Sequence, residues 1–218
     1  MKRALWVVMT VLATLVAAYA AAVLLLPGFG PRLVSARRAT MPLAVTAHLG
    51  GGLVALAVGA WQMNARLRSR VIGLHRWMGR TYVVAVLIGG LGALRMSVVS
   101  EQGWTTHLGF GLLALLWLFT TARAYIAIRS QEEARHRRWM IRSYSLTLAA
   151  VTLRIYLPLG LALGVPFANA YRVISWLCWV PNIILAEWLV RRTQAPIAAV
   201  ADDDASYPSP EMLPVVPR

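Results

Sequence analysis

Six long apolar segments dominate the pattern of hydrophobic and polar positions along the 218-residue chain. Each runs for roughly 20 residues, which is the length of α-helix that crosses the hydrocarbon core of a bilayer. The segments cover residues 5–26, 41–63, 77–99, 106–128, 140–163 and 169–190. The pattern therefore predicts an all-α membrane protein with six transmembrane helices.

The polar segments between these spans predict how the helices are arranged. Short connections force neighbouring helices to run antiparallel, so spans two to five should form a central four-helix bundle, with spans one and six on its flanks. The proline- and glycine-rich segment 27–31 ends the first span, and a loop is expected from there to Thr40. The transmembrane domain is predicted to occupy residues 1–193. The segment 194–218 is acidic and contains proline without periodicity, which predicts a disordered tail.

Composition and charge agree with a lipid environment. Hydrophobic residues make up 59% of the chain and charged residues only 14%, far from the balance of a soluble domain. The formal net charge is +14, but the basic residues gather before span one, between spans two and three, between spans four and five, and after span six. By the positive-inside rule, these segments and both termini are expected to be cytoplasmic. The charge is therefore assigned to topology and to anionic lipid head groups, and not to nucleic acid.

The first span and the single cysteine need separate interpretation. Lys2 and Arg3 followed by an apolar run resemble a secretory signal, but the run continues to Leu26. An uncleaved anchor is therefore expected, with a cleaved signal as the alternative. Cys178 has no second cysteine to pair with and is expected to be a small buried residue.

An internal repeat organises the middle of the chain. HLGGGLVAL, which begins at His48, is answered by HLGFGLLAL at His107, and the His-Arg-Trp-Met segment at His75 is answered at His136 with one residue inserted. These are the four histidines of the chain. Residues 41–99 and 100–163 are therefore interpreted as two copies of a helical hairpin, each with two histidines.

The repeat predicts two histidine pairs at different depths. The outer pair, His48 and His107, lies near the outer ends of spans two and four, and the inner pair, His75 and His136, lies at the inner starts of spans three and five. Two imidazoles on alternate helices can hold one haem iron from both sides, which suits electron transfer rather than oxygen binding. The sequence therefore predicts one or two b-type haems with these histidines as metal ligands. The alternative is that they are ordinary packing residues.

Small residues share the faces of the outer histidines. With about 100° of rotation per residue, Gly52 and Gly59 fall on the face of His48, and Gly111 falls on the face of His107. Such residues leave space for a flat macrocycle between helices. The alternative is that they only allow close helix packing.

Arginines are the other candidate binding residues. Arg154 continues a polar stripe of span five that begins at His136, and an arginine inside the membrane normally faces the protein interior and has a partner. A haem propionate or an anionic substrate would suit it, with Glu187 or a backbone carbonyl as the alternative. Cofactor binding is also assigned to three arginines beside the inner pair, with ordinary topology charges as the alternative: Arg76, Arg80 and Arg137.

Two family resemblances rest on these residues. The segments 75–82, 136–144, 153–154 and 179–188 resemble the bacterial membrane-protein family called domain of unknown function 2306, which implies a multi-span membrane protein without an established activity. More distantly, the pattern of His48 with Gly52 and of His75 with Gly79 is similar to transmembrane diheme b-type cytochromes, including ascorbate-reducible and ferric-reductase-like proteins. That resemblance implies the pairing of His48 with His107 and of His75 with His136. The motif at His136 departs from it, because Met140 stands in place of a glycine.

These observations predict a transmembrane electron carrier in a bacterial inner membrane, with a quinone, an ascorbate-like reductant or a ferric chelate as redox partner. No segment looks like a nucleophile motif, a zinc site or a phosphate loop, so any chemistry would be that of the cofactor. Whether the chain is an oxidoreductase in its own right, and whether it forms a homodimer, is left open. The rival prediction is a haem-free transporter or a lipid- or anion-binding membrane protein, and a structural subunit is a third. If one haem is present, it is expected at the outer pair.

Overall fold

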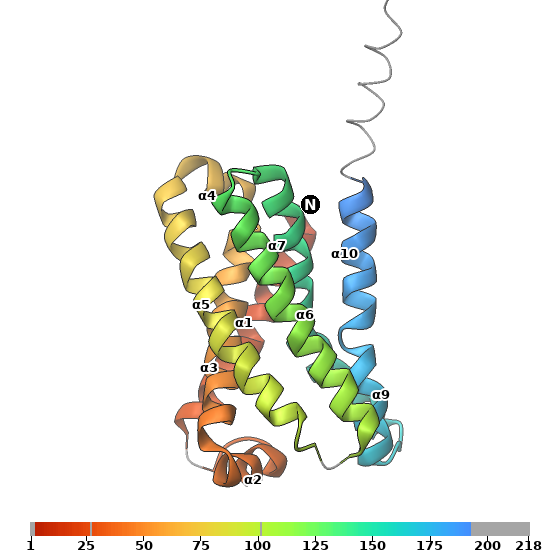
Figure 1. The fold of residues 1–218 in the computed structure, drawn as a ribbon. Helices are drawn as coiled ribbons and strands as arrows, with labels where there is room; N and C mark the ends of the chain where they lie inside the picture. Colours follow the sequence, from red (N-terminus) through yellow and green to blue (C-terminus); the bar gives the residue numbers. More distant parts are fainter. Residues whose placement is uncertain (1–2, 27, 101, 193–218) are drawn as a thin grey trace, which may run out of the picture.

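All the regular structure that the computed structural model describes is α-helical. It covers residues 3–26, 28–100 and 102–192, with the backbone alone for 65–67 (Figure 1). The helices are α1 (Arg3–Leu25), α2 (Arg32–Thr40), α3 (Pro42–Gln62), α4 (Ala65–Arg70), α5 (Ile72–Ser97), α6 (Trp104–Arg129), α7 (Glu133–Thr147), α8 (Ala149–Ala162), α9 (Phe167–Leu177) and α10 (Val180–Arg192).

Six helical segments of the described chain are long and apolar enough to cross a membrane, which confirms the predicted spans. Spans one to four are α1, α3, α5 and α6, span five is α7 with α8, and span six is α9 with α10. Spans three and five begin earlier than predicted, at Ile72 and Glu133. Arginine and glutamate are good helix formers, so the helix continues past the apolar segment toward the head groups. The inner histidines therefore lie within helices.

Two short helices occupy connections that carry no apolar signal. α2 follows Pro31 and runs to Thr40, so the expectation of a loop over this segment is wrong. Its composition explains the error, because the segment is too short and polar to be recognised as a span. It nevertheless packs against α3. α4 forms part of the connection between spans two and three.

Spans two to five form the predicted central bundle. α3 packs along α5, α5 against α6, α6 against α7, and α7 touches α3, which closes the ring. Helices α3 and α6 therefore lie diagonally across the bundle from one another, as do α5 and α7. α1 packs on α3, and α9 and α10 pack on α6 and α7, so spans one and six flank the bundle as expected.

The closest helix pair in the bundle is α3 with α5, which meet through glycines. A Cβ atom on Gly51 would lie 2.4 Å from the carbonyl oxygen of Ala85, and one on Gly92 would lie 2.6 Å from that of Ala44. Backbone therefore touches backbone, as in other membrane helix pairs with small residues at the interface. This contact fixes the position of His48 relative to α5.

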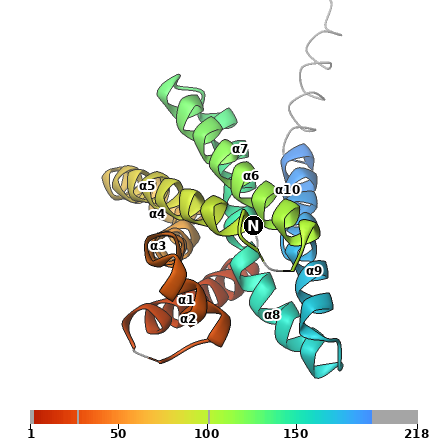
Figure 2. The same cartoon turned by 60° about the horizontal axis from the view of Figure 1, so that its bottom comes forward.

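Spans five and six are both interrupted near mid-membrane. Span five breaks at Leu148 and span six at Cys178 and Trp179. Pro181 contributes to the second break, because it has no N–H to donate to the carbonyl four residues before it. Asn182 joins the two breaks by donating hydrogen bonds to the carbonyl oxygens of Ser145 (3.3 Å) and Cys178 (3.1 Å). The outer halves, α8 and α9, form a separate hairpin, seen from the outer end in Figure 2.

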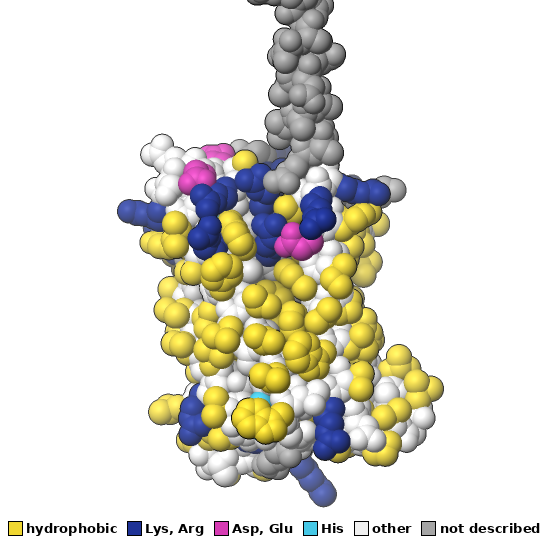
Figure 3. Space-filling model, turned by 45° about the vertical axis from the view of Figure 1, so that its right-hand side comes forward, with side chains coloured by type: hydrophobic (Ala, Val, Ile, Leu, Met, Phe, Trp, Pro, Cys, Tyr) yellow, Lys and Arg dark blue, Asp and Glu magenta, His cyan; other side chains and the backbone are white. Residues whose placement is uncertain are grey.

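The two ends of the bundle differ in charge. Figure 3 shows arginine side chains gathered at one end of the visible face, above a broad apolar area. This inner end carries α4, the α6–α7 turn and the last residues of α10, and the outer end carries α2 and the α8–α9 turn. The first and last described helices both have their free ends on the inner side. The assignment of the inner end to the cytoplasm stays a prediction, and so does the internal repeat. The predicted tail, 194–218, lies outside the described residues.

Candidate functional site

A cavity of about 240 Å³ lies near the outer end, between the bundle and the outer halves of spans five and six. Most of its wall is apolar, and its floor includes Trp117 and Thr147. Among its lining residues are three that the sequence singled out, either as site residues or as small residues on a histidine face: His48, Gly52 and Arg154.

The small residues divide between the cavity and the packing of the bundle. A Cβ atom on Gly52 would meet nothing within 4 Å, which means that Gly52 borders open space. A Cβ on Gly59 would instead lie 2.4 Å from the ring of Tyr144, and one on Gly111 would lie 3.4 Å from the hydroxyl of Ser97. The space beside His48 is therefore present, whereas Gly59 serves close packing and a Cβ on Gly111 would make only an ordinary contact.

His48 is oriented by the backbone of α5. Its Nδ1 lies 3.2 Å from the carbonyl oxygen of Gly89, and a carbonyl can only accept, so Nδ1 carries the proton. The lone pair of Nε2 is then left for another partner. Metal-binding histidines typically have their second nitrogen bonded in this way, because the bond fixes the ring and raises its basicity.

His107 lies beside the cavity wall and is not one of its lining residues. Its Nδ1 donates to the carbonyl oxygen of Ser97 at 2.6 Å, and Ser97 does line the cavity. The ring also packs against Trp104, with centroids 5.6 Å apart. Both outer histidines thus carry the proton on Nδ1, and both donate it to a carbonyl of α5, His48 from α3 and His107 from α6.

Arg154 brings a positive charge into the cavity. One terminal nitrogen donates to the carbonyl oxygen of Ala150 at 2.9 Å, and the guanidinium lies 5.4 Å from the ring centre of Tyr19. Its Nε is buried and has no hydrogen-bond partner among the described residues. Glu187, one predicted alternative partner, is bonded to Arg142 instead, so that alternative is wrong. The other alternative, a backbone carbonyl, holds for one nitrogen only.

The inner pair lies in the first turns of α5 and α7. His136 donates from Nδ1 to the carbonyl oxygen of Ala124 at 2.8 Å. His75 is held through its backbone, whose carbonyl accepts from Gln62 at 2.8 Å, and its Nδ1 is buried without a partner among the described residues. The helices that carry the two inner histidines lie diagonally across the bundle, as do those of the outer pair.

The arginines assigned to the inner pair lie on the surface. Arg76, Arg80 and Arg137 are all exposed, although they lie on the same helices as the inner histidines. Arg154 and His48 line one cavity, whereas none of these three arginines lines it. Their assignment to a cofactor stays a prediction.

A buried polar layer separates the two histidine pairs, and the sequence did not predict it. The hydroxyl of fully buried Tyr82 lies 2.8 Å from the hydroxyls of both Ser143 and Thr147. Thr121 and the indole nitrogen of Trp117 complete the layer, at 2.6 Å from Ser143 and 2.9 Å from Thr147 respectively. The polar stripe on span five was a partial signal for it. Its partners come from spans three and four and are visible only in the fold.

No group of three or more His, Cys, Asp or Glu side chains in the described part of the chain is placed to hold a metal ion. A haem needs fewer protein ligands, because its iron takes only axial ligands from the chain. The pairs described above are therefore the arrangement to test. Cys178 is free and fully buried against the cavity, as expected for a small apolar residue.

The fold defines the class of the protein: it is an integral, multi-pass helical membrane protein. The family described as "Predicted membrane protein (DUF2306)" matches residues 45–190, which is more than half of the chain and includes all four histidines and Arg154. The chain belongs to this family, as its motifs indicated. No curated protein and no solved structure matched the chain. The more distant similarity to diheme cytochromes thus has no support from these comparisons.

Proposed function

We propose that this chain is a transmembrane electron-transfer protein that holds b-type haem between its histidine pairs, with the outer pair as the principal site. The observation that supports this best is His48. Its Nδ1–H is committed to the Gly89 carbonyl, its Nε2 keeps a lone pair, and it lines a mostly apolar cavity between helices. A neutral, oriented imidazole of this kind is a strong iron ligand.

We assign the rest of the haem site to residues that line the cavity or lie beside it. His107 lies on the helix diagonally opposite α3 and has the same Nδ1–H-to-carbonyl arrangement, so it would supply the second ligand. Arg154 would pair with a propionate, since its Nε has no partner among the described residues. Gly52 leaves room beside His48. Haem held by two histidines supplies one-electron transfer.

The inner pair is proposed as a second, weaker site. His136 has the oriented Nδ1, but the Nδ1 of His75 lacks a carbonyl to fix its tautomer. The inner histidines also lie within the first turn of their helices, next to the basic end.

An absorption spectrum of the full chain, expressed with a haem precursor and purified in mild detergent, tests the proposal. The protein should show a Soret band and a reduced α-band, and His48→Ala and His107→Ala should each remove the contribution of the outer haem. Arg95→Gln, at an exposed position of α5, is the matched control and should leave the spectrum unchanged. A folded but colourless preparation overturns the proposal.

Arg154 favours a second candidate, which is a haem-free membrane protein that binds an anionic ligand in the same cavity. A partly unpaired guanidinium in an apolar cavity calls for a negative partner. A colourless protein whose thermal stability rises with an organic anion, but not in Arg154→Gln, would favour this candidate over haem.

A further inference from the structure

A second arginine lies within a span and has no carboxylate. Arg123 is six residues before the end of α6, which places its Cα about 9 Å from the inner end of that helix. Its guanidinium carbon lies 5.4 Å from the ring centre of Trp139 and 6.0 Å from that of Phe119. Among the described residues, no acidic side chain pairs with it. A charge at such depth is costly unless a partner compensates it.

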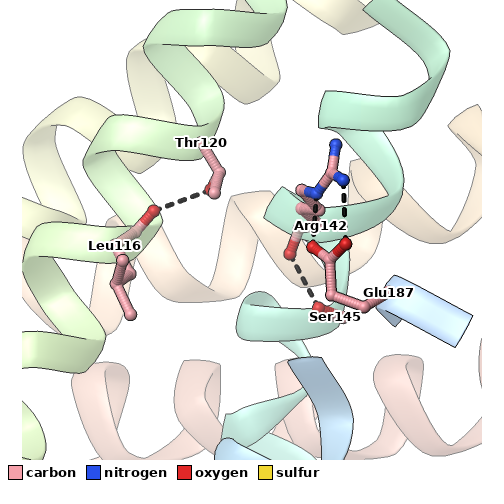
Figure 4. A network of polar contacts seen from close by, with 5 residues as sticks. All are labelled: Leu116, Thr120, Arg142, Ser145 and Glu187. Atoms are coloured by element: carbon pink, nitrogen blue, oxygen red, sulfur yellow. Dashed lines mark hydrogen bonds and ion pairs between the residues drawn. The ribbon is translucent and has the colours of Figure 1, made fainter. Parts of the chain in front are cut away.

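Its neighbour Arg142 is compensated within the protein. The guanidinium carbon of Arg142 lies 4.7 Å from the ring centre of Trp139. The guanidinium also makes a bidentate ion pair with the carboxylate of Glu187, with N–O distances of 2.5 and 2.9 Å. Figure 4 shows this pair joining α7 to α10. The carboxylate of Glu187 therefore pairs with Arg142, and it does not compensate the charge of Arg123.

An exposed apolar stripe of α6 leads to Arg123. Leu108, Leu112, Leu115 and Phe119 are 53, 39, 52 and 51% exposed, and their spacing of four, three and four residues puts them on one helix face. Arg123 follows Phe119 by four residues and so ends this stripe on the inner side. The part of this face from Leu112 to Phe119 lies about 6–17 Å from Arg123 along the helix axis, which matches the roughly 15 Å of one leaflet of the hydrocarbon core.

The packing of span six leaves this region open to lipid. α6 contacts α9 toward the outer end, whereas α10 packs on α7, so span six moves away from α6 toward the inner end. Trp139 of α7 lies in the intervening region, where its half-buried ring contacts both Arg123 and Phe119. Figure 1 shows α10 standing apart from α6 at this end.

We propose that Arg123 and Trp139 form a specific site for an anionic phospholipid. The lipid phosphate pairs with the guanidinium of Arg123, and one acyl chain lies along the Leu112–Phe119 part of the exposed face of α6. Basic pockets between transmembrane helices bind anionic head groups in this way. The site is separate from the outer cavity and does not depend on haem.

Native mass spectrometry of the full chain in detergent, with phosphatidylglycerol and phosphatidylcholine added at equal concentration, tests the site. The wild-type protein should retain phosphatidylglycerol in preference, and Arg123→Gln should reduce that preference by about fivefold or more, the effect of one arginine near anionic lipid. Arg123→Lys, which keeps the charge, should retain part of it. Glu187→Gln should increase the preference, because Arg142 then lacks its carboxylate.

Arg129→Gln is the matched control, since it removes the same charge from the exposed last residue of the same helix. Helix content by circular dichroism must be equal in all variants that are compared. Equal retention by Arg123→Gln and the wild type overturns the proposal, as does an equal loss in Arg129→Gln.

Discussion

The four histidines differ in the bonds that their rings make. His48, His107 and His136 each place Nδ1 on a backbone carbonyl, at 3.2, 2.6 and 2.8 Å, while His75 does not. The carbonyls of Gly89 and Ser97 belong to α5, so one helix orients both outer rings. The position of α5 relative to α3 therefore controls the geometry at His48. Glycine is what allows α5 to come close enough.

Substitution by alanine should affect stability differently at two adjacent glycines of α3. Gly51→Ala places a methyl group 2.4 Å from the Ala85 carbonyl and 2.6 Å from the nitrogen of Gly89, so the helices must separate. We expect a loss of about 1–3 kcal/mol in the free energy of unfolding, typical of overpacking. Gly52→Ala meets nothing within 4 Å and should leave stability nearly unchanged. Thermal unfolding of both variants in detergent compares them, and an equal loss would contradict the assigned packing.

At the scale of elements, spans five and six depart from continuous helices. The breaks at Leu148 and Cys178 lie opposite each other and share hydrogen bonds through Thr152 and Asn182. The hairpin of α8 and α9 consequently carries Arg154 to the cavity without packing closely along α3 or α5. α9 packs on α6, but α8 has few contacts with the bundle, so α8 is expected to open more readily than the rest of the fold.

Asn182→Leu tests the connection between the two breaks. The change removes the amide that donates to Ser145, Thr152 and Cys178, each bond being worth about 0.5–1.5 kcal/mol. Amide hydrogen exchange should become faster in residues 148–153 and 177–182, while exchange in α3 stays as in the wild type. Uniformly faster exchange throughout the chain would instead indicate a global loss of stability.

At the scale of the whole molecule, charge and apolar surface fix how the protein lies in a bilayer. The apolar area in Figure 3 is bounded by a strongly basic inner end and an outer end with fewer charges. Side chains such as Leu43, Val84 and Ile184 are 85, 54 and 62% exposed, which only lipid makes favourable. The positive-inside rule then predicts that the basic end faces the cytoplasm.

Single cysteines can test this orientation. In a Cys178→Ser background, Thr105→Cys at the outer start of α6 should react with a membrane-impermeant maleimide applied to right-side-out vesicles. Ser130→Cys, at the exposed inner end of the same helix, should react only after the membrane is permeabilised. The reverse pattern would place the basic end outside. Because both positions belong to one helix, a difference in expression or folding cannot produce the contrast.

Much of the site followed from the sequence, and the remainder needed three-dimensional contacts. His48, Gly52 and Arg154 were expected to face the interior, and all three line one cavity. The period of the helix was sufficient for that, because it puts residues three, four and seven apart on one face. The burial of Tyr82 with Ser143 and the use of Glu187 by Arg142 depend on which helices are neighbours, and helical periodicity carries no such information.

The sequence by itself determined the class and the spans of this protein. The length of an apolar segment and the charge beside it are local properties of the sequence, and they decide whether and in which direction a helix crosses the bilayer. It also placed the histidines at two depths, since depth follows from position along a helix. Only the tertiary structure decided that His48 has a free Nε2 beside a cavity while His107 lies at its wall, and that Arg123 lies over Trp139 without a carboxylate. Those outcomes depend on helix neighbours, close glycine contacts and breaks in two spans, which are properties of packing.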